Sequence, residues 1–220
     1  MSCDRFIRLL TGCLWVSFLC PVSAQVIPDN SLGAENSLVT QDEEAIVDLI
    51  EGGAVRGTSL FHSFSEFGVV DGRQVYFANP NGITDILSRV TGNNISEIFG
   101  TLGVQGAANL FLLNPNGIVF GENASLDLNG SFLATTANSF EFADDGYSYD
   151  ATNPNLPPLL KVNIPVGLQF GAEIGAIEVR GTGHKLVLDP RLNINKALRS
   201  PGLGLEVAQG NTLALIGGGI

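Results

Sequence analysis

Short runs of alternating apolar and polar residues, interrupted by glycine, asparagine, aspartate or proline at nearly every step, constrain this chain most. From residue 59 onward the apolar residues recur at every second position, as at Leu126 and Leu128. This alternation is typical of half-buried β-strands, because successive side chains on a strand point to opposite faces. Two further runs alternate in the same way, and we expect their apolar residues to point inward. They are Val162, Ile164 and Val166 in one run, and Leu203, Leu205 and Val207 in the other. The chain is therefore predicted to be all-β.

Three segments depart from simple alternation. Residues 110–113 are apolar on both faces, which predicts a strand that is covered on both sides. Residues 42–50 predict one or two helical turns, which Gly52 and Gly53 would end. Residues 142–158 are acidic, rich in proline and without a pattern, which predicts a loop that leaves the core.

Two features favour a β-solenoid over the sandwich or barrel that short strands otherwise suggest. Several brief strand-like runs end in glycine, as in residues 103–106, 175–181 and 211–219. In a solenoid such strands stack on their equivalents in the next coil. Residues 214–216 still form a good strand pattern near the end of the sequence, and solenoid ends need a cap. We therefore expect either the start of a longer β-helix or, alternatively, a frayed tail.

The N-terminus predicts a secretory signal peptide. Arg5 and Arg8 precede an apolar run, and small residues ending at Ala24 follow it. That order is typical of a peptide cleaved after the small residues. The run is short for a membrane anchor, and the leucine before its last cysteine is unfavourable for lipid modification. We assign residues 1–24 to a signal peptide read by the Sec machinery and residues 25–220 to one domain.

Composition narrows the classes of function. Cys3, Cys13 and Cys20 all lie in the predicted signal peptide, so the exported chain would contain no thiol and would be stabilised without disulfides. The formal net charge is −11, which argues against nucleic acid or an anionic membrane surface as a partner.

Patterns for catalysis or metal binding are absent from the sequence: it has no G-x-S-x-G, H-E-x-x-H or C-x-x-C. His62 and His184 are far apart in the chain, and a lone histidine is more often structural. The acidic segment at 142–158 does not have the spacing of a calcium loop, so we interpret it as solvated. Its carboxylates include Asp144, Asp145 and Asp150. We expect no enzyme activity, no cofactor and no metal.

The sequence N-P-N-G occurs twice, at Asn114-Pro115-Asn116-Gly117 and at Asn79-Pro80-Asn81-Gly82. Asparagine at the first position can bond to the backbone two residues on, proline presets the second position, and glycine suits the fourth. This combination is typical of a type I β-turn. We predict a type I turn at both copies.

The copy at residues 114–117 lies inside a longer resemblance to a known family. Residues 109–121, NLFLLNPNGIVFG, followed by Ala124-Ser125-Leu126, resemble the two-partner secretion (TPS) domain. This is the filamentous-haemagglutinin-type N-terminal domain of large exported proteins of Gram-negative bacteria. Further matching segments are residues 57–67, 86–92, 132–137 and 166–171. The resemblance covers essentially all of residues 25–220 and is closest to the cyanobacterial branch.

The resemblance implies a right-handed parallel β-helix, a single-stranded β-solenoid, with an N-terminal cap and extra-helical hairpins. It also implies a non-enzymatic role in export to the cell surface or the medium by way of the periplasm. The partner would be an outer-membrane β-barrel pore whose POTRA domains recognise the extended chain, which then folds outside and can template a following β-helix. Slow folding of a fold rich in non-local contacts would leave time for this transit.

Two motifs, N-P-N-G-I and N-P-N-L, are hallmarks of the family. Asn114, Pro115, Asn116, Gly117 and Ile118 match the first and form our candidate motif for partner recognition and folding. Asn153-Pro154-Asn155-Leu156 spells the second but lies downstream of the first, whereas the family has it upstream. Asn79, Pro80, Asn81 and Gly82 form a secondary turn motif.

Two other classes of function stay open on sequence grounds. One is an adhesin that binds its ligand directly through this domain. The other is a β-helix enzyme that cleaves polysaccharides, which would need clustered carboxylates with a basic residue on one face.

Overall fold

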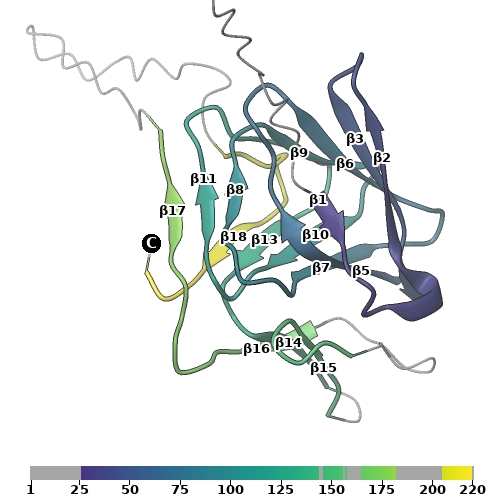
Figure 1. Cartoon of the computed structure of the whole chain (residues 1–220), viewed down its shortest axis with the longest axis vertical. Helices are drawn as coiled ribbons and strands as arrows, with labels where there is room; N and C mark the ends of the chain where they lie inside the picture. The colour runs from purple at the N-terminus through teal and green to yellow at the C-terminus, as the bar shows by residue number, and fades with distance from the viewer. Residues whose placement is uncertain (1–25, 144–145, 156, 158–164, 182–204, 220) are drawn as a thin grey trace, which may run out of the picture.

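The computed structural model describes residues 26–143, 146–155, 157, 165–181 and 205–219, and it shows a parallel β-solenoid with one extra sheet (Figure 1). The predicted signal peptide and His184 lie outside the described residues. In the part of the chain that the structure describes, no helix is long and apolar enough to cross a membrane. The all-β prediction is confirmed.

The coil repeats a passage through three parallel sheets. Sheet A contains β5 (Ser59–Phe67), β7 (Asp85–Val90), β10 (Asn109–Leu113), β13 (Phe132–Thr135) and β18 (Leu213–Ile216). Sheet C contains β8 (Ser96–Ile98), β11 (Ile118–Phe120) and β17 (Ile177–Val179). Sheet B contains β3 (Val47–Gly52), β6 (Gln74–Ala78), β9 (Thr101–Gln105) and β12 (Ser125–Asp127). Consecutive strands of a sheet therefore come from consecutive coils.

Antiparallel strands cap the N-terminal end of the coil. β1 (Val26–Pro28) and β4 (Ala54–Arg56) pair with β5, and β2 (Ser37–Asp42) pairs with β3. A short 3-10 helix, η1 (Gly33–Glu35), lies between β1 and β2. The first strands of sheets A and B are thus covered before the parallel stacking begins, which confirms the expected cap.

The predicted helical turns at residues 42–50 are wrong, because this segment forms the β2–β3 hairpin. The carboxylate of Asp42 accepts hydrogen bonds from the backbone N–H groups of Glu44 and Ala45, at 3.0 and 2.9 Å. Ile46 has a φ of 59°, a left-handed conformation that closes the turn. Strand pairing on both sides of β3 then overrides a weak helical pattern.

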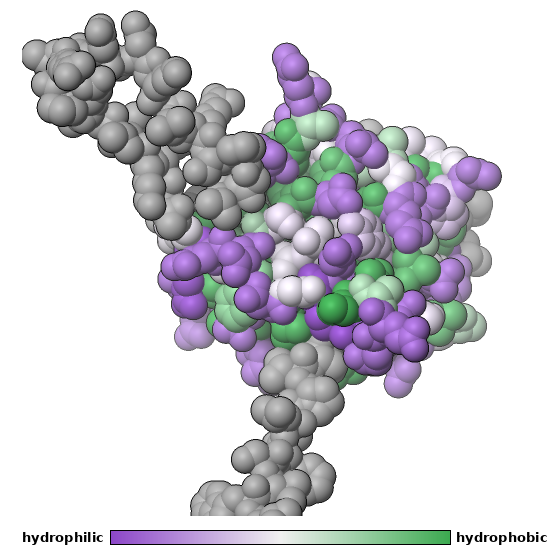
Figure 2. All heavy atoms as spheres, turned by 90° about the horizontal axis from the view of Figure 1, so that it is seen from above, coloured by the Kyte–Doolittle hydropathy of each residue, from purple (hydrophilic) through white to green (hydrophobic). Residues whose placement is uncertain are grey.

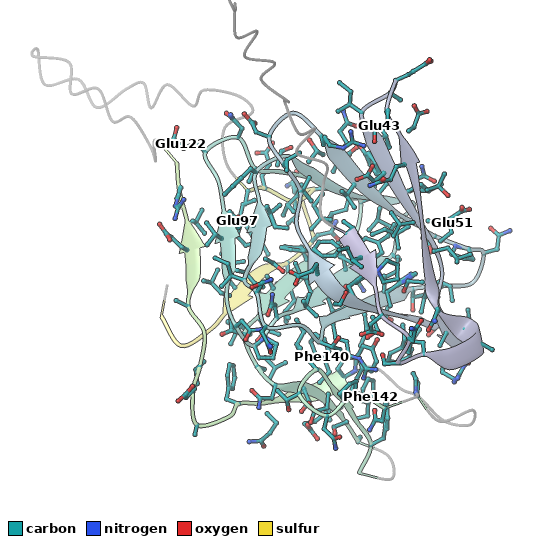
Figure 3. The ribbon with its side chains drawn as sticks, in the orientation of Figure 1. Glu43, Glu51, Glu97, Glu122, Phe140 and Phe142 are labelled. Carbon is teal, nitrogen blue, oxygen red and sulfur yellow. The ribbon has the colours of Figure 1, made fainter. Side chains whose placement is uncertain are left out.

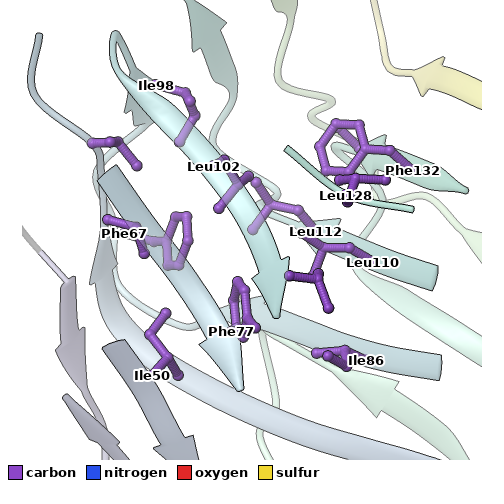
Figure 4. Packing of buried hydrophobic residues seen from close by; sticks show 14 of the residues in the cluster. Ile50, Phe67, Phe77, Ile86, Ile98, Leu102, Leu110, Leu112, Leu128 and Phe132 are labelled. Carbon is purple, nitrogen blue, oxygen red and sulfur yellow. The ribbon is translucent and has the colours of Figure 1, made fainter. Parts of the chain in front are cut away.

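The solenoid interior is filled by rows of apolar side chains, one from each coil (Figure 4). In sheet A the buried row runs through Leu60, Ile86, Leu110 and Phe132, whose strands pair in this register. Leu213 of β18 is the register partner of Phe132 but is 37% exposed. The predicted inward residues Leu126 and Leu128 pack against this core. Leu205 and Val207 also pack against it, although no strand forms there, and Leu203 lies outside the described residues.

A fourth sheet, sheet D, covers the outer face of sheet A. It contains β14 (Ser139–Phe142), β15 (Ser148–Asp150) and β16 (Pro165–Gln169), all antiparallel. Figure 3 shows Phe140 and Phe142 between this layer and the coil, where they join a second apolar cluster with Leu113. Residues 110–113 are thus packed on both faces of the sheet, as predicted.

Sheet D corrects two expectations. The segment predicted as a patternless loop contains β15, so part of it is ordered by pairing with β14. Val166 was expected to point inward but is 68% exposed, because β16 belongs to the extra sheet and not to a coil. Val162 and Ile164 lie outside the described residues. The extra-helical hairpin implied by the family resemblance is present.

Most of the face in Figure 2 carries hydrophilic side chains, with separate hydrophobic patches between them. Glu43, Glu51, Glu97 and Glu122 lie on the outside of the ribbon in Figure 3. The acidic composition is therefore distributed over the described surface.

Candidate recognition and folding motif

The side chain of Asn114 connects two coils. Asn114 follows β10 and is fully buried. Its amide nitrogen donates to the carbonyl of Asn94 at 3.0 Å and to Oγ of Ser96 at 2.9 Å, both in the preceding coil. Its side-chain oxygen accepts the backbone N–H of Asn116 at 3.0 Å. The first residue of the motif therefore bonds both within its own turn and to the coil before it.

The turn agrees with the predicted type I geometry. The N–H of Gly117 donates to the carbonyl of Asn114 at 3.2 Å, and neither Pro115 nor Asn116 has a positive φ. Asn116 is exposed, and its side-chain amide donates to the carbonyl of Gly92 at 2.8 Å. The turn leads directly into β11, where the side chain of Ile118 enters the core.

The following coil packs against the other side of the turn. The N–H of Gly175 donates to the carbonyl of Pro115 at 3.1 Å, and the N–H of Ile118 donates to the carbonyl of Ala176 at 3.1 Å. A Cβ atom on Gly175 would lie 2.5 Å from the carbonyl oxygen of Pro115, so only glycine allows this approach. The motif is thus held between coils on both sides.

The copy at residues 79–82 forms a different turn, and the prediction of type I is wrong there. The closing hydrogen bond joins the N–H of Ile83 to the carbonyl of Pro80, at 3.2 Å. Gly82 is the third residue of this turn and has a φ of 89°, whereas Asn81 does not have a positive φ. This is the pattern of a type II turn shifted by one residue along the chain.

The surroundings of Asn79 explain the shift. Its side-chain amide lies beside Gly106 of the next coil, where a Cβ atom would be only 2.4 Å from it. With its amide oriented to satisfy these groups, the oxygen accepts the N–H groups of Ala107 and Ala108 at 3.3 and 3.2 Å. The side-chain nitrogen donates to the carbonyls of Pro80 and Ile83 at 3.3 and 3.2 Å. The side chain of Asn79 therefore joins this loop to the next coil, and the turn itself is closed by Pro80 and Ile83.

The downstream Asn153-Pro154-Asn155 segment lies in the outer layer, and Leu156 is outside the described residues. The carboxylate of Asp150 accepts the N–H of Thr152 at 2.7 Å and that of Asn153 at 3.0 Å, which orders the local turn. The three N-P-N segments do not converge on one surface motif: each bonds to different parts of the fold. Asp144 and Asp145 lie outside the described residues.

His62 lies inside the coil, remote from any cluster of acidic groups. Its Nδ1 is 2.9 Å from Oγ of Ser37, and its Nε2 has no protein partner. Burial lowers the pKa of His62 to about 3, so the ring is neutral at physiological pH. Within the described ranges, no group of three or more His, Cys, Asp or Glu side chains could hold a metal ion.

Sequence reasoning missed the residues that complete the motif. Ser96 is one of them, and Gly175 is another, on the opposite side of the turn. Their distance from the motif in the sequence hides the contact. The register of Ile118 with Ser96 and Ile177 in sheet C is the signal that places them beside it.

Fold and motif together define a capped parallel β-solenoid domain whose N-P-N-G-I turn is hydrogen-bonded to the coil before it and to the coil after it. A match to the family described as the TPS secretion domain covers residues 24–220, and the chain belongs to this family. Domains of this family belong to exported proteins, and the family is served by a dedicated transporter.

Two solved structures are similar to part of the chain. The HMW1 secretion domain from Haemophilus influenzae is 26% identical, with a TM-score of 0.41, over 51% of this chain and 27% of that one. The filamentous hemagglutinin secretion domain is 24% identical, with a TM-score of 0.44, over 55% of this chain and 44% of that one. The similarity thus spans less than half the length of either solved chain. A search of curated proteins found no match.

Proposed function

We propose that this chain is a non-enzymatic secretion domain that directs a larger surface or secreted protein across the outer membrane of a Gram-negative bacterium. Its partner is a β-barrel pore with POTRA domains, and the domain starts β-helix folding after it emerges. The observation that carries this proposal is the family match, which extends over residues 24–220.

The contacts of the N-P-N-G-I motif support recognition before folding. In the folded chain Asn114 is fully buried, and Gly117 and Ile118 are buried as well. A partner that reads the whole motif needs these groups exposed, which is the case only in an unfolded chain. We propose that the transporter binds this segment in extended form and that the same residues then close the turn between coils.

The experiment measures export in cells that produce the chain and its partner transporter. A chain that lacks Asn114-Pro115-Asn116-Gly117 should still reach the periplasm but should not be released to the medium. Quantitative immunoblots of medium and periplasm measure the two pools. Undiminished release of the deletion variant, or release of the intact chain without the transporter, would contradict the proposal.

A matched control separates recognition from folding. Deleting Asn79-Pro80-Asn81-Gly82 removes the same four residue types from a turn that lies outside the candidate motif. If release depends on the motif itself, this second deletion should reduce folding of the released chain more than its passage through the pore. If both deletions lose release equally, release depends on the ability of the chain to fold and not on recognition of the motif.

A further inference from the structure

The outer layer covers a buried arginine that forms no direct ion pair with a carboxylate of the described residues. Arg89 lies on β7 and is fully buried, and its guanidinium carbon is 4.1 Å from the centre of the Tyr149 ring. Among the described residues, its N–H groups bond only to hydroxyl and carbonyl oxygens. A buried charge is costly unless an opposite charge compensates it. A negative charge that compensates Arg89 is therefore expected nearby, beyond its direct hydrogen-bond partners.

Two of the acceptors belong to one segment of the outer layer, residues 147–155, which we call the strap. Nη1 of Arg89 donates to the carbonyl of Asp150 at 2.9 Å, and Nη2 donates to the carbonyl of Asn155 at 2.9 Å. The strap also contributes Tyr149, whose hydroxyl donates to the carbonyl of His62 at 2.7 Å. The arginine thus fixes the strap over the outer face of sheet A.

The other two acceptors are serine hydroxyls that lead to a carboxylate. Nη2 of Arg89 donates to Oγ of Ser31 at 2.8 Å, and Nε donates to Oγ of Ser63 at 2.9 Å. These hydroxyls donate in turn to the two carboxylate oxygens of Asp29, at 2.6 and 2.7 Å. Each hydroxyl has one proton, so a serine that accepts from the arginine is free to donate to the aspartate. Oγ of Ser31 also lies 2.8 Å from Oγ of Ser63, but the charged carboxylate is closer and is the better acceptor for its proton. In both serines the hydroxyl oxygen accepts from Arg89 and the hydroxyl proton points to Asp29.

The environment of Asp29 stabilises its charged form. Partial burial alone would raise the pKa of this carboxyl, but hydrogen bonds from Ser31, Thr91 and Ser63 outweigh burial and hold the pKa below its usual value. Asp29 directly follows β1 in the N-terminal cap. A charge in the cap is thus two hydrogen bonds away from Arg89 and three from the strap.

We propose that Asp29 and Arg89 form an ion pair bridged by the hydroxyls of Ser31 and Ser63, and that this bridge couples the N-terminal cap to the strap. The strap stays closed over sheet A only while the cap carboxylate is in place. In a chain that folds from its N-terminus, the bridge makes closure of the outer layer wait for the cap. This inference goes beyond the proposed function and does not depend on it.

The test is amide hydrogen exchange, followed by mass spectrometry, on the purified full chain with Asp29→Asn. Among the described residues, the Asp29 side chain bonds to Ser31, Ser63 and Thr91 and not to the strap. The substitution should nevertheless accelerate exchange in residues 147–155 by about tenfold to a hundredfold, because the buried charge of Arg89 is no longer compensated. Exchange in β6 and β9 should stay unchanged. Unchanged exchange in the strap, or equal acceleration throughout the coils, would overturn the proposal.

Two further variants sharpen the test. Arg89→Met should open the strap, and adding Asp29→Asn to it should accelerate exchange no further, because both remove the same bridge. If Arg89→Met does not fold, the double variant Ser31→Ala with Ser63→Ala replaces it in the same comparison, because it removes both bridging hydroxyls. Asp127→Asn is the matched control: its carboxylate accepts the hydroxyl of Tyr76 at 2.6 Å on sheet B and should leave the strap unaffected. Additive effects of the paired substitutions, or an open strap in the control, would count against coupling.

Discussion

At the scale of single residues, Asn114 has every side-chain hydrogen-bonding group satisfied although it is fully buried. Its two amide hydrogens bond to Asn94 and Ser96, and its oxygen accepts from the backbone and the side chain of Asn116. This position requires asparagine, because any other side chain leaves several buried partners without a hydrogen bond. Asn114 therefore contributes to the fold through its contacts with the preceding coil.

Replacing Asn114 by alanine should lower the free energy of unfolding by about 2–4 kcal/mol, since the partners at Ser96 and Asn116 lose their bonds in a buried site. Urea unfolding followed by circular dichroism measures the change. Asn81→Ala, at an exposed position of the other N-P-N-G copy, should cost less than about 0.5 kcal/mol. Equal costs for the two variants would contradict the structural role of Asn114.

His62 gives the fold a dependence on pH. Its pKa is near 6.5 in an unfolded chain and is lowered to about 3 by burial in the fold. The unfolded state therefore takes up a proton that the folded state excludes. The contribution of neutral His62 to stability is complete above about pH 6.5 and is lost progressively as the pH falls toward 3.

Lowering the pH from 7.5 to 5 should cost the protein roughly 2 kcal/mol through His62, because each unit below the unfolded pKa is worth about 1.4 kcal/mol. His62→Gln removes this titration, so the stability difference between the two proteins should narrow by that amount. Urea midpoints at four pH values in this range provide the measurement. Parallel pH profiles for the two proteins would show that His62 does not titrate on unfolding.

At the scale of structural elements, the two N-P-N-G copies show that a four-residue sequence does not determine its turn. The turn at Asn114 ends with Gly117 in its fourth position, whereas the other turn has Gly82 in its third. Both glycines have a positive φ, but the values of 135° and 89° place them in different regions. Contacts with neighbouring coils select the turn in each case.

The two glycines should respond differently to alanine. Gly82→Ala should cost about 1 kcal/mol, since its φ is unfavourable for alanine but nothing lies within 4 Å of the added Cβ. Gly117→Ala should cost about 2–4 kcal/mol, because its Cβ would also lie 3.1 Å from the carbonyl of Ala176. Chemical unfolding of the two variants side by side tests the order. A larger loss for Gly82→Ala would contradict the assigned turns.

Elements with a strong local pattern were predicted correctly from the sequence. The strand at residues 110–113 has apolar residues on both faces, and the structure covers both faces. The inward positions of Leu126 and Leu128 follow from alternation alone. The solenoid was favoured by glycine-ended runs, two of which contain β17 and β18.

Elements that depend on distant partners could not be predicted in this way. Residues 42–50 have a weak helical pattern, and pairing of β3 with both β2 and β6 fixes them as a hairpin. Val166 alternates like a core residue, but its strand pairs with β14 in the extra sheet. The candidate motif was found by its family resemblance, whereas its partners Ser96 and Gly175 depend on the register between coils. Local sequence contains no information on that register.

At the scale of the whole molecule, every coil is completed by contacts between residues far apart in the chain. Leu60 pairs with Ile86, and Phe132 pairs with Leu213. Folds dominated by such non-local pairs form slowly, because loop closure precedes the stabilising contacts. The three cysteines all lie within the first 20 residues, so disulfides cannot fasten one coil to the next. Both properties suit a chain that crosses a pore before it folds.

An engineered disulfide between coils tests whether the chain crosses the outer membrane unfolded. Thr101 and Ser125 are register partners on β9 and β12, and their side-chain oxygens are 2.9 Å apart. Thr101→Cys combined with Ser125→Cys should form a disulfide in the oxidising periplasm and close a loop that cannot thread a narrow pore. Release to the medium should then be lost and should return when a reductant is added. Each single cysteine variant is a control and should be released normally. Non-reducing gels identify the oxidised double variant. Its release to the medium would show that the chain does not need to cross the membrane in extended form.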